Sequence, residues 1–273
     1  MKVFLSVDME GIGGIVSEKE TDPVNGGEAY QASRRRMTAE TNAAIEGAIE
    51  AGAEEALVAD SHWNFDNLIP EDLHEAAVLL RGHPRSHEMM HGLDGTFAAA
   101  LLVGYHAMAG APRAILDHTF TGRIRSVEVN GLVVGETGLS AYLAGHFGVP
   151  VVLVTGDAAV TAEARALLPH VQTATVKEAV SATAARNLHP KKAQALIRAE
   201  AAKGIRGVGT ATPLRATSPV SVAIDFKGTE AADRAEVVPG VRRVGGTRIE
   251  FEAKDFLEAF RAFDAAIGLA HAD

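Results

Sequence analysis

Two acidic residues, Asp8 and Glu10, stand two positions apart in the segment SVDMEGIGG (6–14), directly after the apolar run 3–5. Alternate residues of a β-strand point to the same face, so the two carboxylates can converge on one point. Carboxylates held close together lose hydration and repel each other unless a cation lies between them or one takes up a proton. A divalent metal ion relieves this repulsion directly. Taken alone, the pair could equally cap the following turn and face solvent.

Three more segments place potential metal ligands at the end of an expected strand. LVADSH (57–62) ends in Asp60 and His62, LLVGYH (101–106) ends in His106, and VVGE (133–136) leads through Glu136 into an expected helix. Each of these residues taken singly is more often structural. Their repeated occurrence at strand ends indicates one shared site, because the carboxyl ends of strands in an open α/β sheet are where ligands bind.

The candidates together offer two imidazoles and three carboxylates, which suits zinc first and manganese or cobalt second. A single catalytic zinc ion keeps an open position and takes fewer protein ligands. With one bridging carboxylate, five ligands give each of two ions three, as in two-metal hydrolases. The sequence therefore predicts a binuclear hydrolase with these candidate ligands: Asp8, Glu10, His62, His106 and Glu136. We expect Asp60 to act behind them by orienting His62 or the strand end.

The glycines that follow the acidic pair also allow a nucleotide-binding interpretation, which we reject. Gly11 and Gly13 do not complete the G-x-G-x-x-G pattern, because Val16 occupies the position of the third glycine. Acidic residues directly ahead of the loop would also repel a phosphate. We expect these glycines instead to give the backbone and a substrate room for close approach beside the metals.

The elements that position these residues alternate along the chain. Short β-branched runs and alanine-rich helical patterns predict an α/β fold with a Rossmann-like, largely parallel sheet. We expect strands at 125–130 and 132–134 to form a hairpin around the turn residues Asn130 and Gly131. The other expected strands cover 3–7, 55–59, 77–80, 98–105, 149–155 and 173–176, and the expected helices cover 28–51, 138–147 and 156–168.

After residue 187 the composition and the pattern of expected elements change. A charged helix over 190–203 and a stretch rich in Gly, Thr and Pro over 204–219 precede strands at 220–226 and 248–251 and a last helix at 253–269. We predict a catalytic α/β domain over 1–190 and a smaller α+β domain over 191–273. The apolar residues of the last helix fit either a core or a subunit contact; they are Phe256, Leu257, Phe260 and Phe263.

Composition narrows the class of protein. The 273 residues include no cysteine, which excludes thiolate zinc sites and a cysteine nucleophile, and the net charge of −9 argues against a nucleic-acid partner. No apolar run is long enough to span a bilayer, and Asp8 interrupts the apolar N-terminal run too early for a signal peptide. We expect a soluble, cytoplasmic protein with no membrane partner.

Five motifs of this sequence resemble the M55 family of metallopeptidases, the bacterial D-aminopeptidases: SVDMEGIGG, VADSH, LVGYHA, LDHT and VGETGLSAYLAG. The resemblance runs through essentially the whole chain, down to FEAKDFLEAFRAF (251–263). It implies two zinc ions per subunit with Asp8 bridging them, Glu10 and His62 on one ion, and His106 and Glu136 on the other. It also implies that His118, in LDHT, is the catalytic residue beside the metals.

The resemblance further implies an aminopeptidase for short peptides with an N-terminal D-amino acid, such as D-Ala-D-Ala. It implies a ring-shaped homodecamer whose active sites face an inner channel, to which the C-terminal domain would contribute contacts and lining. One alternative is another binuclear hydrolase, an amidase or a phosphoesterase, although Arg123 and Arg125 are the only nearby cations for a phosphate. The other alternative is a peptide-binding transport component, which would have no use for five convergent ligands.

Overall fold

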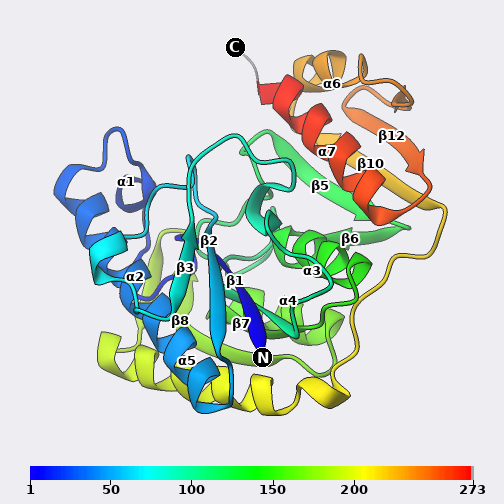
Figure 1. Ribbon diagram of the computed structural model, residues 1–273. Coiled ribbons are helices and arrows are strands. Elements are labelled where there is room, and N and C mark those ends of the chain that lie inside the picture. Colours follow the sequence, from blue (N-terminus) through cyan, green and yellow to red (C-terminus); the bar gives the residue numbers. More distant parts are fainter. Residues whose placement is uncertain (272–273) are drawn as a thin grey trace.

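Two β-sheets organise the chain (Figure 1). The structure is a computed structural model, and it describes residues 1–271. The first sheet has seven strands in the order β3-β2-β1-β4-β7-β8-β9, and the second has five in the order β11-β12-β10-β5-β6. This is the predicted fold class, a largely parallel sheet accompanied by a smaller α+β part.

The strands of the first sheet are nearly continuous apolar runs. Every residue of β4 and β7 is buried, as expected for parallel strands covered on both faces. All neighbouring strands are parallel except β8 and β9, which are antiparallel. The strands are β1 (Lys2–Val7), β2 (Glu55–Asp60), β3 (Ala77–Leu80), β4 (Ala99–Tyr105), β7 (Val151–Asp157), β8 (Gln172–Ser181) and β9 (Ala184–Asn187).

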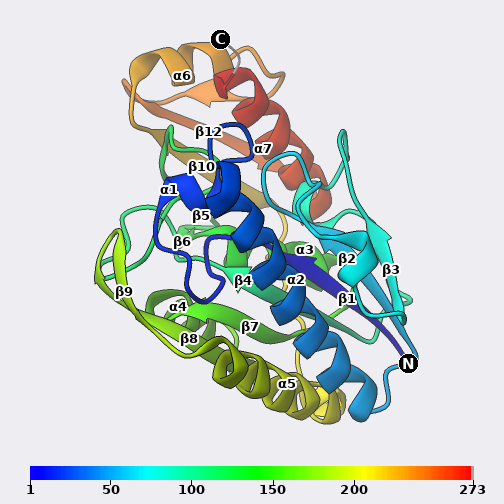
Figure 2. The ribbon, with the colours of Figure 1, turned by 90° about the vertical axis from the view of Figure 1, so that its left-hand side faces the viewer.

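Helices cover both faces of the first sheet. On one face α2 (Gly27–Glu50), preceded by the short α1 (Glu18–Thr21), packs against α5 (Pro190–Arg206), as Figure 2 shows. The other face is covered by α3 (Glu136–His146) and α4 (Ala158–Leu167). Within residues 1–271 no helix combines the length and the apolar character that crossing a membrane requires.

The order of the strands brings the expected ligand positions together. β1 lies between β2 and β4, and its last residue, Val7, pairs with Asp60 on one side and with Val103 on the other. The chain runs outward from β1 through β2 to β3 and then returns to the opposite side of β1 at β4. Such a reversal is the point at which open α/β sheets bind their ligands, beyond the carboxyl ends of the strands.

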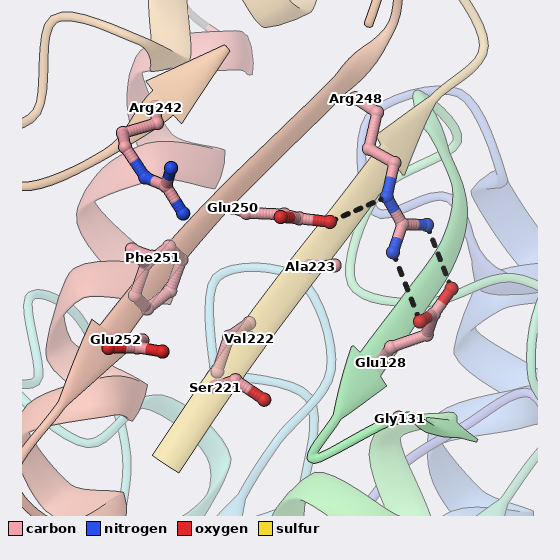
Figure 3. A pocket seen from close by; sticks show the side chains of 10 residues that line it. All are labelled: Glu128, Gly131, Ser221, Val222, Ala223, Arg242, Arg248, Glu250, Phe251 and Glu252. Atoms are coloured by element: carbon pink, nitrogen blue, oxygen red, sulfur yellow. Dashed lines mark hydrogen bonds and ion pairs between the residues drawn. The ribbon is translucent and has the colours of Figure 1, made fainter. Parts of the chain in front are cut away.

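The second sheet is antiparallel and has one face toward solvent. In β5 the apolar residues Ile124, Val127 and Val129 are buried, whereas Glu128 lies on the opposite face, where Arg248 contacts it and Glu250 (Figure 3). The elements of this part are β5 (Ile124–Val129), β6 (Leu132–Val134), β10 (Val220–Phe226), β11 (Arg242–Arg243), β12 (Arg248–Ala253), α6 (Thr229–Ala235) and α7 (Phe256–His271).

Helix α7 packs on the inner face of the second sheet and joins it to the first. Phe256, Phe260 and Phe263 are buried, and Phe256 lies against Tyr142 of α3 with ring centroids 5.2 Å apart. The aromatic residues of the last helix therefore belong to the core of the chain, one of the two roles that their pattern allowed. A single apolar core continues from the first sheet through α3 and α7 to the second sheet.

The boundary predicted at residue 190 does not coincide with the separation between the two sheets. The hairpin β5–β6, expected within the first domain, pairs with β10 in the second sheet, and α5, expected in the second domain, packs on the first sheet. The hairpin has alternating apolar and polar residues, which suit a sheet with one solvent face rather than a doubly covered one. Several short elements were not predicted: α1, β9, α6, β11 and the 3₁₀ helices η1 (Pro70–Asp72), η2 (Glu88–Met90) and η3 (Val208–Thr210).

Candidate metal centre

The five predicted ligands lie together beyond the carboxyl ends of β1, β2 and β4. Asp8 and Glu10 follow β1, His62 follows β2, His106 follows β4, and Glu136 is the first residue of α3. All five are buried, with at most 6% of any of them exposed. A cluster of three carboxyl groups and two imidazoles with so little access to water requires compensation of its charges.

Asp8 occupies the centre of the cluster. Its Oδ1 atom lies 3.3 Å from Nδ1 of His62, and its Oδ2 atom lies 3.5 Å from Nε2 of His106. On one side Glu10 Oε2 is 3.0 Å from the same His62 nitrogen, and on the other side Glu136 Oε1 is 3.3 Å from the same His106 nitrogen. One carboxylate therefore stands between two pairs, each formed by a histidine and an acid.

Main-chain carbonyls fix the far sides of both imidazole rings. Nε2 of His62 lies 2.8 Å from the Thr21 carbonyl oxygen, and Nδ1 of His106 lies 3.0 Å from that of Ala107. A ring nitrogen that donates to a carbonyl holds the proton of a neutral imidazole, so the nitrogen facing the acids is left as an acceptor. This is the arrangement in which histidines coordinate metals.

Three buried atoms of the cluster have no hydrogen-bond partner: Asp8 Oδ2, Glu10 Oε2 and His106 Nε2. Each of them is an oxygen or nitrogen acceptor aimed at other acceptors, an arrangement that costs free energy unless a cation lies among them. Nitrogen and carboxylate oxygen donors in this number are the ligands that zinc prefers. The residues present therefore fit a metal centre at this position.

The pKa shifts within the cluster indicate that a metal would replace bound protons. Burial, with the charge of Glu10, raises the pKa of Asp8 to about 7. Burial acts in the opposite direction for His62 and His106, but the neighbouring acids raise the pKa of both imidazoles well above their ordinary range. Without a metal, protons balance the carboxylates, and metal binding displaces them.

His118 lies at the edge of the cluster and is partly open to solvent. Its Nδ1 is 2.8 Å from the Leu116 carbonyl, its Nε2 is 3.8 Å from Glu136 Oε1, and its ring stacks on His106 with centroids 3.9 Å apart. Burial and the neighbouring charge of His106 lower the pKa of His118. An oriented, uncharged imidazole with a free nitrogen at this edge suits proton transfer, and the same nitrogen lies within reach of a metal held by His106 and Glu136.

Asp60 stabilises the loop that follows β2, whereas the His62 ring contacts Thr21, Asp8 and Glu10. Its carboxylate accepts hydrogen bonds from the main-chain amides of Asn67 and Leu68, both at 2.6 Å, and from the Asn67 side chain at 2.8 Å. The Asn67 side chain in turn donates to the His62 carbonyl at 2.5 Å. Asp60 thus acts on the backbone of His62, directly through a hydrogen bond with its main chain and indirectly through Asn67.

The glycines after the acidic pair allow two loops to touch. The amide of Gly11 donates to the Gly104 carbonyl at 2.8 Å, and a Cβ atom at Gly11 would lie 1.9 Å from the Tyr105 carbonyl oxygen. Gly104 has a φ of +70°, and a Cβ atom there would lie 2.3 Å from the Asp8 carbonyl oxygen. Side chains at these positions would separate the loops that hold Asp8 and His106.

A cavity of about 590 Å³ opens onto the cluster. Its walls come from the loop after β2, from the region of η2, and from α7, with Trp63 half-exposed at the cavity. These wall residues could not be predicted, because nothing in the sequence places α7 opposite the ends of β1 and β2. Thr21 and Phe120, whose main-chain groups contact His62 and Glu136, were not predicted either.

Comparison with known proteins assigns the chain to a family. The sequence model of the M55 peptidases, described as D-aminopeptidase, matches residues 1–265. A D-aminopeptidase of Bacillus subtilis (strain 168) is 39% identical over 263 residues, which cover 96% of this chain and 95% of that relative. The solved structure of a Zn-dependent D-aminopeptidase DppA from Bacillus subtilis, described as a self-compartmentalizing protease, superposes with a TM-score of 0.96 at 37% identity, covering 100% of this chain and 99% of that one. The chain therefore belongs to the M55 peptidase family, the D-aminopeptidases.

Proposed function

We propose that this chain is a zinc-dependent aminopeptidase that removes the N-terminal residue from short peptides and prefers D-amino acids there, as in D-Ala-D-Ala. We propose two zinc ions per subunit, although manganese or cobalt could replace them. The observation that supports this most directly is the position of the Asp8 carboxylate, between His62 with Glu10 and His106 with Glu136. The names of the two relatives, a D-aminopeptidase and a Zn-dependent D-aminopeptidase, agree with it.

The candidate residues would have separate roles in metal binding and proton transfer. Asp8 would bridge the two metals, Glu10 and His62 would complete the ligands of one, and His106 and Glu136 those of the other. When bound, two zinc ions supply a hydroxide at neutral pH and polarise the scissile carbonyl. His118, oriented by the Leu116 carbonyl, would give a proton to the leaving amine.

The cavity favours a peptide over a phosphate ester as the substrate. Among the described residues that line it, none is a lysine or an arginine. Arg125 lies on β5, where it is 3.7 Å from Asp225, and Arg123 is not part of the cavity wall. A phosphoesterase would place cations near the metals for the charge of the transferred group. The volume of the cavity lies in the range usual for small-molecule sites.

We also propose that the chain works as a homo-oligomer, a ring-shaped decamer with active sites facing an inner channel. The description of the solved relative as self-compartmentalizing supports an assembly of this kind. The part of the chain after residue 190 would then contribute subunit contacts and line the channel.

The proposed function is tested by metal removal and readdition. The purified protein should contain two zinc ions per chain, lose hydrolysis of D-Ala-p-nitroanilide on chelation, and regain it with zinc. D-Ala-D-Ala and the D-anilide should be cleaved faster than the L-anilide. Asp8→Asn should lose both ions, whereas Glu10→Gln should lose one.

The alternatives give different results in the same assays. Hydrolysis of amides that lack a free α-amino group would indicate an amidase, and hydrolysis of p-nitrophenyl phosphate a phosphoesterase. Bound zinc without cleavage of any D- or L-aminoacyl substrate would refute the peptidase and leave a peptide-binding protein.

A further inference from the structure

A buried lysine lies behind the loop that follows β1. Lys177 belongs to β8, where it pairs with Asp157 of β7 and Asn187 of β9, and only 2% of it is exposed. Lysine is rarely buried to this degree, because its ammonium group loses hydration. The strand predicted at 173–176 ends directly before this lysine, for which the sequence predicts no role.

The ammonium group of Lys177 is bound by main-chain oxygens of one short loop. Its Nζ donates to the carbonyls of Glu10 at 2.5 Å, Ile12 at 2.9 Å and Ile15 at 2.7 Å. An ammonium group has three donors, so all three are used on the loop 10–15. Without the lysine, three carbonyls would converge in the protein interior with no donor among them.

A second buried side chain, which belongs to α2, also binds the loop 10–15. Glu40 of α2 is 3% exposed, and its Oε1 atom accepts a hydrogen bond of 3.0 Å from the amide of Gly13. The loop is therefore held through its carbonyls by β8 and through an amide by α2. Neither side chain is among the residues that line the cavity at the metal centre.

The contact with the Glu10 carbonyl connects Lys177 to the metal centre. The backbone dihedrals that direct the Glu10 carbonyl toward Lys177 also set the direction in which the Glu10 side chain leaves the backbone. That side chain places its carboxylate 3.0 Å from His62 Nδ1. We propose that Lys177 is a positioning residue that holds the Glu10 carboxylate beside Asp8 and His62, and so sets the zinc affinity of that side of the centre. This rests on the proposed function.

The first test compares Lys177→Met with a control that is destabilised elsewhere. Methionine has nearly the length of lysine without the ammonium group. Ile197→Ala removes buried apolar contacts from α5, on the same face of the first sheet, and leaves in place the side chains of Lys177 and Glu40 that hydrogen-bond the loop 10–15. Zinc content and zinc affinity, by chelator competition, are measured with the thermal midpoint and with kcat and KM for the D-anilide.

Lys177→Met should retain one zinc ion and bind the other more than tenfold more weakly than the wild type. Ile197→Ala should bind both ions with wild-type affinity at a comparable loss of thermal midpoint. Two ions with unchanged affinity in Lys177→Met would overturn the inference while leaving the proposed function intact. A wild-type protein that binds no zinc would instead refute the proposed function.

The lack of cysteine in the chain allows a chemical rescue. Lys177→Cys is alkylated in denaturant with 2-bromoethylamine, which restores an ammonium group at the length of lysine, or with 1-iodopropane, which restores the length alone. Both products are refolded, with the wild type taken through the same cycle.

Recovery of the second zinc ion by the aminoethylated product only is the expected result. Recovery by both products would show that apolar packing suffices and would overturn the inference. The inference would also be overturned if the aminoethylated product folded while the propylated product and Lys177→Met did not. Lys177 would then be needed for folding rather than for the position of Glu10.

Discussion

At the scale of single residues, main-chain carbonyls select the nitrogen that each histidine offers to the site. His62 is held through Nε2 and presents Nδ1, whereas His106 and His118 are held through Nδ1 and present Nε2. Nδ1 lies nearer to the backbone than Nε2 does. We therefore expect the backbone to lie nearer to the cluster at His62, where a turn begins with the hydrogen bond from the Phe65 amide to the His62 carbonyl, than at His106.

His118 provides a prediction at this scale. His118→Ala should keep both zinc ions and lose turnover by about 10²- to 10⁴-fold, the usual contribution of a general acid or base. The reason is that His118 lies at the edge of the cluster, while the five proposed ligands surround its centre. Zinc content and kcat for the D-anilide are the measurements, with His106→Ala as the control that loses metal.

Two outcomes would contradict this role. Retained metal with turnover near that of the wild type would remove His118 from the reaction. Loss of one zinc ion would make it a ligand, in keeping with its distance from His106 and Glu136.

At the scale of elements, η2 and α7 meet at the cavity through the carboxyl groups of Glu88 and Asp264. Burial and the charge of Asp264 raise the pKa of Glu88 to about 7, and burial raises that of Asp264. The two side chains are hydrogen-bonded to each other, which requires one of them to hold a proton. Arg85 acts in the opposite direction on Glu88. The contact between the two elements therefore depends on pH.

The sign of this dependence follows from the raised pKa of Glu88. The folded chain holds the Glu88 proton more tightly than the unfolded chain, so the stability contributed by this proton is present below pH 4.5 and is lost as the pH rises to about 7. Glu88→Gln, whose amide can donate to Asp264 at any pH, should raise the thermal midpoint relative to the wild type at pH 8 but not at pH 5. Glu71→Gln, at an exposed position on η1, is the matched control.

Differential scanning calorimetry at the two pH values measures the effect. An equal shift of the midpoint at pH 5 and pH 8 would contradict the shared proton between η2 and α7. The same result from Glu71→Gln would attribute the change to net charge.

The elements of the first sheet were predictable because strands that are buried on both faces consist of nearly continuous apolar residues. β3, β6 and β10 match their predicted ranges, and the ends of the other predicted strands differ by a few residues, most at β8. The partner of β5 was not predictable, since β10 lies some ninety residues further along the chain and local patterns do not specify distant pairing. β9 and α6 are short and mostly polar, so they give only a weak periodic signal.

The same distinction applies to the site. The five acidic and imidazole side chains could be grouped because all follow strands, and the structure brings them together; their role as ligands stays a prediction. Lys177, Glu88 and Asp264 could not be placed, because their partners depend on the path of the chain in space. A lysine within the strand-like segment TATVKEAV (173–180) was the one local sign.

At the scale of the whole molecule, several exposed apolar side chains belong to the second sheet, its helices and the segments beside them. Leu132, Val133, Val237, Val244 and Leu269 are each at least 41% exposed. Surfaces of this kind are usual in subunit contacts. For the decamer proposed above, light scattering of the purified protein should give a mass close to ten times the 28.6 kDa of one chain.

Leu132→Glu tests the surface itself. It should reduce the mass of the assembly, because a charge in a subunit contact loses its hydration. Val78→Glu, a comparably exposed position on β3 at the edge of the first sheet, should leave the mass unchanged. A wild-type protein that is monomeric at all concentrations would contradict the assembly.

The hairpin β5–β6 has a consequence for how the gene can be divided. The chain leaves the first sheet after His106, passes His118, enters the second sheet at β5, and returns to Glu136. A gene fragment that encodes residues 1–190 would supply all five candidate ligands but lack β10, so β5 would expose an unpaired edge beside the active-site loop. Recombination between two M55 genes near codon 190 would mismatch β5 and β10 in the same way. The coding sequences of the two sheets must therefore stay together when the gene is divided or recombined, although the sheets occupy separate layers of the protein.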